Sequence, residues 1–170
     1  MRRPASLFAA TSALLATTAC GSGTFAEVTG TVAGVKLNPT TYYWGGPFLV
    51  FTNLEQDCKD MAWVERGPFF ENGGEAPVSD DMVALLFTFE DTDVTGGTNV
   101  SLKGESAVDA RLLVVESDAL TVYKAKEGEF IVDEAEEGDN ALGSFALSFD
   151  DGTLTGDYEV EWCTNLKTPY

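Results

Sequence analysis

The sequence predicts an all-β fold, and specifically an antiparallel β-sandwich, with a β-barrel as the alternative. Many short runs rich in β-branched and aromatic residues are separated by turns that contain glycine or acidic residues. Evidence for helices is slight along the whole chain. Near the end, two runs in which apolar and polar residues alternate flank an Asp-Gly turn. These features are typical of a sandwich or a barrel.

The first 19 residues predict a secretory signal peptide. Arg2 and Arg3 precede the apolar run at residues 7–16, and small residues follow it before Cys20. A run of ten residues is too short to cross a bilayer, which requires roughly 20. We expect three regions, namely a signal peptide at residues 1–19, a lipidated cysteine and flexible tether at residues 20–26, and a single domain at residues 27–170.

Ala19 and Cys20 resemble the end of the bacterial lipoprotein signal, although Thr17 stands where that signal usually has leucine. The resemblance implies cleavage just before Cys20, acylation of its thiol by chains such as palmitate, and attachment to a membrane of the cell envelope. In a host with two membranes, Gly21 in place of aspartate implies the outer membrane. The alternative is an ordinary secretory signal with an unmodified cysteine.

The three cysteines support this interpretation independently. An exported protein rarely leaves a cysteine unpaired, so a lipidated Cys20 leaves Cys58 and Cys163 as one disulfide pair. In the chain-entropy account, the resulting loop of about a hundred residues is worth about 4–5 kcal/mol. Two buried thiols or a metal site are the alternatives, and the absence of histidine and of CxxC spacing disfavours the metal site.

Net charge limits the partners. The full chain carries a formal charge of −18. Removal of Arg2 and Arg3 leaves 8 basic residues against 28 acidic ones, or −20. Nucleic acid and anionic headgroups would be repelled, so we expect no nucleic-acid partner. A heavily solvated surface explains this acidity better than cation capture does.

Strands are expected throughout the chain after the tether. Gly30 and Gly34 in the first strand indicate a bulge or a close approach of a neighbouring backbone. The most apolar run, residues 82–89, predicts a buried central strand. The expected strands are 27–37, 48–53, 82–89, 99–103, 107–115, 120–125, 129–133, 145–149 and 154–162.

Two connections are expected to lack strands. Residues 55–62 predict one helical turn around Cys58. Residues 63–79 predict a loop, because Pro68 and Pro77 interrupt regular structure there, as do Gly73 and Gly74. Residues 134–140 predict a solvated acidic loop.

The last two strands predict a hairpin around the turn at residues 150–152, with one apolar and one polar face. Cys163 falls on the polar side of this alternation. A bond to Cys58 therefore requires a bulge near Trp162 or a segment packed over the outer face. The run from Gly152 to Cys163 also resembles the closing strand of exported lipoproteins found in myxobacteria. That resemblance implies a similar β-domain and brings no catalytic residues with it.

The chain lacks the residues that several enzyme classes need. Without histidine it has no Ser-His-Asp or Cys-His system, and no GxxxxGK[ST] loop occurs. We expect no enzymatic activity, cofactor or resident metal. Asp91, Asp93 and Thr95 imitate a calcium loop, but Leu102 occupies its twelfth position, which excludes an EF-hand and leaves a looser surface calcium site open. A carboxylate-dependent glycoside hydrolase is one alternative.

Tyr42, Tyr43 and Trp44 are the candidate ligand-binding residues, because aromatic rings beside a glycine turn can form a platform for sugars. Adjacent residues in an extended chain point to opposite faces, however, so at least one ring is expected in the core. An exposed Trp44 beside Tyr42 or Trp63 would favour a carbohydrate-binding module. We expect a membrane-anchored, exported, non-enzymatic domain that binds a partner or contributes to envelope structure, with a glycan or a protein as the open choice of partner.

Overall fold

The computed structural model describes residues 24–78, 81–89, 96–103 and 108–166. This part of the chain contains ten strands and one 3₁₀-helix, so the all-β prediction is confirmed. The elements are β1 Phe25–Val32, β2 Thr41–Gly45, β3 Phe48–Thr52, η1 Cys58–Phe69, β4 Met82–Phe89, β5 Thr98–Lys103, β6 Val108–Glu116, β7 Ala119–Lys124, β8 Glu127–Ala135, β9 Ala141–Phe149 and β10 Gly152–Trp162.

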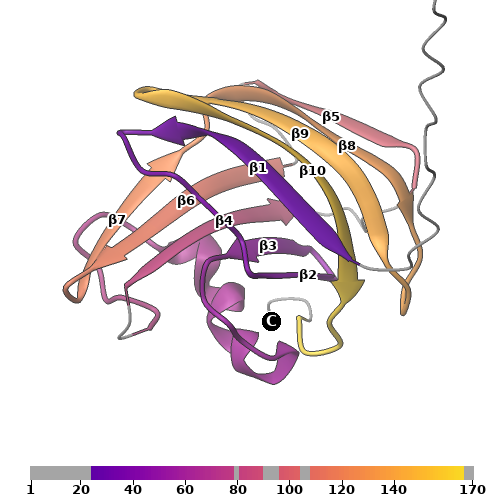
Figure 1. Ribbon diagram of the computed structural model, residues 1–170, viewed down its shortest axis with the longest axis horizontal. Coiled ribbons are helices and arrows are strands. Elements are labelled where there is room, and N and C mark those ends of the chain that lie inside the picture. Colours follow the sequence, from indigo (N-terminus) through magenta and orange to yellow (C-terminus); the bar gives the residue numbers. More distant parts are fainter. Residues whose placement is uncertain (1–23, 79–80, 90–95, 104–107, 167–170) are drawn as a thin grey trace, which may run out of the picture.

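The strands form one curled sheet rather than a sandwich, and Figure 1 shows its half-barrel outline. The strand order is β5-β8-β9-β10-β2-β3-β4-β6-β7, with β1 also pairing with β10. In the view of Figure 1, β1, β10, β9, β8 and β5 form the upper arc, and β2, β3, β4, β6 and β7 curve beneath it. The prediction of an antiparallel sandwich is therefore wrong.

Strand β10 joins the two arcs into a single sheet because it pairs with strands of both. It pairs antiparallel with β9 from Gly152 to Val160, and with β1 from Gly152 to Glu159 on its other side. Its last two residues, Glu161 and Trp162, extend past β1 and pair in parallel with β2. One long strand thus belongs to both arcs, and the parallel pair makes the sheet mixed. Alternation along a strand predicts its faces but not its partners.

The interior of the curl holds the larger hydrophobic core. Phe51, Phe87, Phe130 and Tyr158 are essentially inaccessible to solvent. Their rings contact one another with centroid separations such as 4.7 Å between Phe87 and Phe130 and 5.7 Å between Phe51 and Tyr158. The alternating pattern of the last hairpin is confirmed, because Phe145, Leu147 and Phe149 of β9 face this core.

A second core lies on the outer face of β3, β4 and β6, where η1 covers the sheet (Figure 1). Strands β3 and β4 are consequently buried on both faces, which confirms the prediction of a buried central strand at residues 82–89. Met61, Trp63 and Val64 of η1 pack against Phe48, Leu86 and Leu113.

The helix itself was only partly predicted. Residues 55–62 were expected to form one turn and residues 63–79 a loop, but η1 continues through Pro68 to Phe69. The segment retains helical geometry because three of its apolar side chains fill the outer core, and burial of this kind outweighs weak local propensity.

Gly30 shows why the first strand can close onto the last hairpin. Its backbone has φ of 102°, and a Cβ atom there would lie 2.1 Å from the carbonyl oxygen of Thr153. The predicted close approach of a neighbouring backbone is confirmed at this position. Gly34 instead has φ of 81° with no atom near an added Cβ, so it serves the turn after β1.

Candidate functional site

Cys58 and Cys163 form a disulfide bond with a Cα–Cα distance of 5.5 Å, as the cysteine count predicted. Cys58 begins η1, and Cys163 follows the last residue of β10 and is fully buried in the outer core. Of the two predicted ways to reach a cysteine on the polar side of β10, the structure uses a segment packed over the outer face. The bond joins η1 to the strand that holds both arcs together.

Cys20, the predicted lipid attachment site, lies outside the described residues. The chain is described from Thr24, whose carbonyl oxygen accepts a hydrogen bond of 2.9 Å from the Tyr42 hydroxyl. The first described residue is therefore fixed against β2.

Trp44 is buried, with 3% of its surface exposed. Its ring contacts Trp162 edge-on at a centroid separation of 4.6 Å, and its Nε1 donates a hydrogen bond of 2.9 Å to the Asp139 carbonyl oxygen. Trp63 is also buried and donates from Nε1 to Gln56 Oε1. These two tryptophans lie in different cores. They therefore do not form the exposed groove that would favour a carbohydrate-binding module.

Tyr42 and Tyr43 point to opposite faces, as expected for neighbours in a strand. Half-buried Tyr42 packs against the interior core, whereas half-buried Tyr43 packs against the outer core. Burial raises the pKa of Tyr43, and the nearby carboxylates Glu161 and Asp57 add to that increase. The three candidate aromatics therefore do not share one surface.

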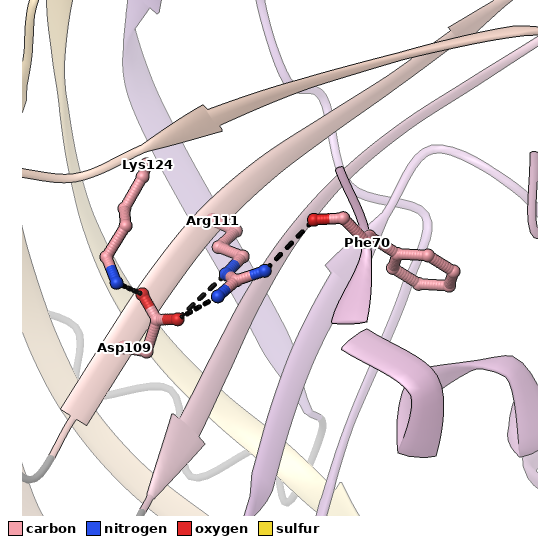
Figure 2. A network of polar contacts seen from close by, with 4 residues as sticks. All are labelled: Phe70, Asp109, Arg111 and Lys124. Atoms are coloured by element: carbon pink, nitrogen blue, oxygen red, sulfur yellow. Dashed lines mark hydrogen bonds and ion pairs between the residues drawn. The ribbon is translucent and has the colours of Figure 1, made fainter. Parts of the chain in front are cut away.

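A polar network on the outer face of β6 was not predicted (Figure 2). Asp109 Oδ2 accepts from Arg111 Nε at 2.7 Å and lies 2.6 Å from Arg111 Nη2. Lys124 Nζ lies 3.2 Å from the other carboxylate oxygen. Arg111 Nη1 donates a 3.0 Å hydrogen bond to the carbonyl oxygen of Phe70, the residue after η1.

This network connects η1 to the sheet at the end opposite the disulfide. Asp109 and Arg111 each expose only about a sixth of their side chains, 16% and 17% respectively. Asp109 Oδ1 is buried and accepts no well-directed hydrogen bond, and its contact with Lys124 Nζ is an ion pair. The sequence did contain a signal for this network. Asp109 and Arg111 are opposite charges two residues apart in an apolar strand, and such residues lie on the same face.

The metal and hydrolase hypotheses can be compared with the described residues only in part. Within the described ranges, no three carboxylate, cysteine or histidine side chains come together to hold a metal ion. Asp91, Asp93 and Thr95 lie outside those ranges. Asp109, a partly buried carboxylate, is neutralised by Arg111 and Lys124.

Among the described residues, no helix has the length and apolar character needed to cross a membrane. Comparisons with protein-family models, curated proteins and solved structures gave no match. Function must therefore be inferred from the residues themselves, and above all from the arrangement of the cysteines.

Proposed function

We propose that this protein is an exported lipoprotein of the bacterial cell envelope. In this proposal, residues 1–19 are removed, Cys20 carries the lipid, and the β-domain acts without catalysis as a binding or structural component. The absence of aspartate after Cys20 favours the outer membrane of a two-membrane host.

The disulfide is the observation that best supports the proposal. The chain has three cysteines, and the bond between Cys58 and Cys163 leaves Cys20 over. Disulfides persist in oxidising compartments outside the cytosol. The remaining thiol follows an apolar run of the length expected for a cleaved signal, so acylation gives it a role that agrees with an oxidising environment.

The outer surface of the upper arc supports a binding or structural role. On β1 and β10, exposed threonines and carboxylates alternate with buried residues, and Thr29 and Thr155 share a hydrogen bond of 2.7 Å between their hydroxyls. A glycan or protein that contacts this face would meet hydroxyl and carboxylate groups on adjacent strands. Specificity would then depend on hydrogen bonds rather than on an apolar pocket.

Intact mass spectrometry of the membrane-extracted protein, without reductant, tests the proposal. We expect a chain that begins at Cys20, carries acyl chains and has two fewer hydrogens than the dithiol form. A Cys20→Ser variant is the control and should lack the acyl mass while it retains the disulfide. Recovery of the unaltered protein in the water-soluble fraction, with an unmodified Cys20, would contradict the proposal.

A further inference from the structure

Three aromatic residues lie at the end of the half-barrel where β1 begins, one on the outer face of the sheet beside Glu159 and two on the interior face. Phe25 is the first residue of β1 and is 43% exposed. Tyr42 is held beside the start of this strand by its hydrogen bond to Thr24. Trp162, at the end of β10, is half-buried and packs against Trp44. We call Phe25, Tyr42 and Trp162 the aromatic end.

We propose that the aromatic end rests on the membrane that holds the Cys20 lipid, with neutral, zwitterionic phospholipid headgroups as its partner. This inference rests on the proposed function, because it requires the lipid. It adds an orientation, in which one particular end of the domain faces the bilayer and η1 does not.

The length of the tether limits which surfaces can reach the membrane. The expected tether at residues 20–26 is shortened by β1, which begins at Phe25. Only residues 21–24 separate Cys20 from Phe25, so the five steps between these Cα atoms span at most about 18 Å. A compact domain of about 145 residues is expected to be about 38 Å across. The tether is therefore shorter than the domain, and the surface around Phe25 must stay closest to the lipid.

Side-chain chemistry selects the same end of the domain. Tyrosine and tryptophan combine an apolar ring with a polar group and are enriched at membrane interfaces. Phe25 and Phe69 are the two large apolar side chains that are exposed in the described part of the chain. Phe69 ends η1 beside β6, which lies four strands from β10 in the sheet order, or about 19 Å along the sheet.

Neighbouring charge selects the type of lipid. Phe25 pairs in register with Glu159, and Glu161 lies two residues further along β10. These carboxylates would be repelled by anionic headgroups but not by zwitterionic ones. Contact should therefore weaken when anionic lipid is added to the bilayer.

Tryptophan reporters at the two exposed phenylalanines test the orientation. Acylated F25W and F69W proteins are each reconstituted into phosphatidylcholine vesicles with brominated or ordinary acyl chains. Bromine quenches nearby tryptophan emission, and the unaltered chain provides the background from Trp44, Trp63 and Trp162. We expect loss of the added emission for F25W, no such loss for F69W, and a smaller loss for F25W when phosphatidylglycerol is included.

Equal quenching of both reporters, or quenching of F69W alone, would overturn the proposal. Intact mass of the same preparations separates this failure from failure of the proposed function. An acylated F25W protein without quenching refutes only the orientation, whereas an unmodified Cys20 refutes both.

Amide hydrogen exchange of the unaltered chain provides a second measurement. On vesicles, the segment around Phe25 should be protected relative to a soluble Cys20→Ser chain, and the segment around Phe69 should be unchanged.

Discussion

At the residue scale, Arg111 has an unusual combination of contacts. It neutralises the half-buried Asp109 and also donates to the Phe70 carbonyl oxygen, so it joins strand β6 to the end of η1 (Figure 2). The planar guanidinium can satisfy both partners at once because its donors are fixed in different directions. Two ion pairs elsewhere in the described part of the chain, Lys59 with Asp57 and Lys126 with Asp150, lie between well-exposed side chains.

Replacement of Arg111 by methionine should lower the free energy of unfolding by about 1–3 kcal/mol, because it leaves the Phe70 carbonyl oxygen and one oxygen of Asp109 without their donors. Lys126→Met is the matched control, since it removes a surface ion pair and should cost less than about 1 kcal/mol. Urea denaturation measures both. Similar losses for the two variants would show that the network does not stabilise the fold.

Tyr158 should make stability depend on alkaline pH. Its hydroxyl donates to the Ile131 carbonyl oxygen at 3.0 Å, and burial, with Asp133 nearby, raises its pKa well above the ordinary value. The unfolded phenol ionises near pH 10 while the folded one remains protonated, so the free energy of unfolding should fall as pH rises past about 10.

A Tyr158→Phe variant separates the two contributions of this hydroxyl. At neutral pH it should lose about 1–2 kcal/mol, because the hydrogen bond to Ile131 is absent. Above pH 10 its stability should fall less steeply than that of the unaltered protein. Urea titrations between pH 8 and pH 11 measure both effects, and an unchanged alkaline slope would exclude Tyr158 as its source.

At the element scale, η1 is a cover that is held at both ends. The disulfide fixes Cys58 to the end of β10, and Arg111 fixes the carbonyl group just past Phe69. Residues after the helix continue this attachment along the edge of β7, where Asn72 accepts a hydrogen bond from the Val122 amide and the Gly73 amide donates to Leu120. The edge strand β7 is thereby partly shielded.

Removal of the disulfide should release this cover before the sheet unfolds. A Cys58→Ser, Cys163→Ser protein should be destabilised by about 2–5 kcal/mol, since the bond joins residues 105 apart in sequence. Hydrogen exchange should show much lower protection across η1 and nearly unchanged protection in β4. The unaltered protein in reductant provides the comparison, and uniform loss of protection would show that η1 and the sheet unfold as one unit.

Alanine substitutions at Gly30 and Gly34 distinguish the cost of a steric clash from the cost of a left-handed backbone conformation. Both have positive φ, but only Gly30 has a neighbouring backbone within reach of an added Cβ. Gly34→Ala should cost about 1 kcal/mol from the left-handed conformation alone. Gly30→Ala should cost about 1–3 kcal/mol more, because the strand must move away from Thr153. Thermal unfolding of the two variants provides the test, and equal costs would contradict the close approach.

Individual elements were more predictable than their arrangement. The alternation of β9 and β10 and the apolar run of β4 were sufficient to predict those strands. The sequence did not predict β2 as a strand that pairs with β10, or β5 as the neighbour of β8, because pairing between distant segments leaves no local pattern. The outer core was also missed, because residues 63–79 were predicted to be a loop and the apolar residues of η1 were not assigned to a core.

At the scale of the whole molecule, the sheet brings the two ends of the domain together. Strand β1 pairs with β10 over eight residue pairs, and the disulfide closes the same region from the outer face. Strand β10 and the residue after it therefore contact both the first strand and the helix that covers the outer core. A disturbance at the end of β10 should reach both cores, because Trp162 packs against one and Cys163 is buried in the other.

The large net negative charge, −18 for the full chain and −20 without residues 1–19, should make the stability of the whole domain sensitive to salt. Repulsion among many carboxylates destabilises a compact state, and an increase in ionic strength from about 0.01 to 0.15 M shortens the screening length from about 30 to 8 Å. We expect the melting temperature to rise over this range of sodium chloride. At equal ionic strength, calcium chloride should produce nearly the same increase if screening is the cause. A much larger increase with calcium, accompanied by heat in a calorimetric titration, would instead indicate specific cation binding.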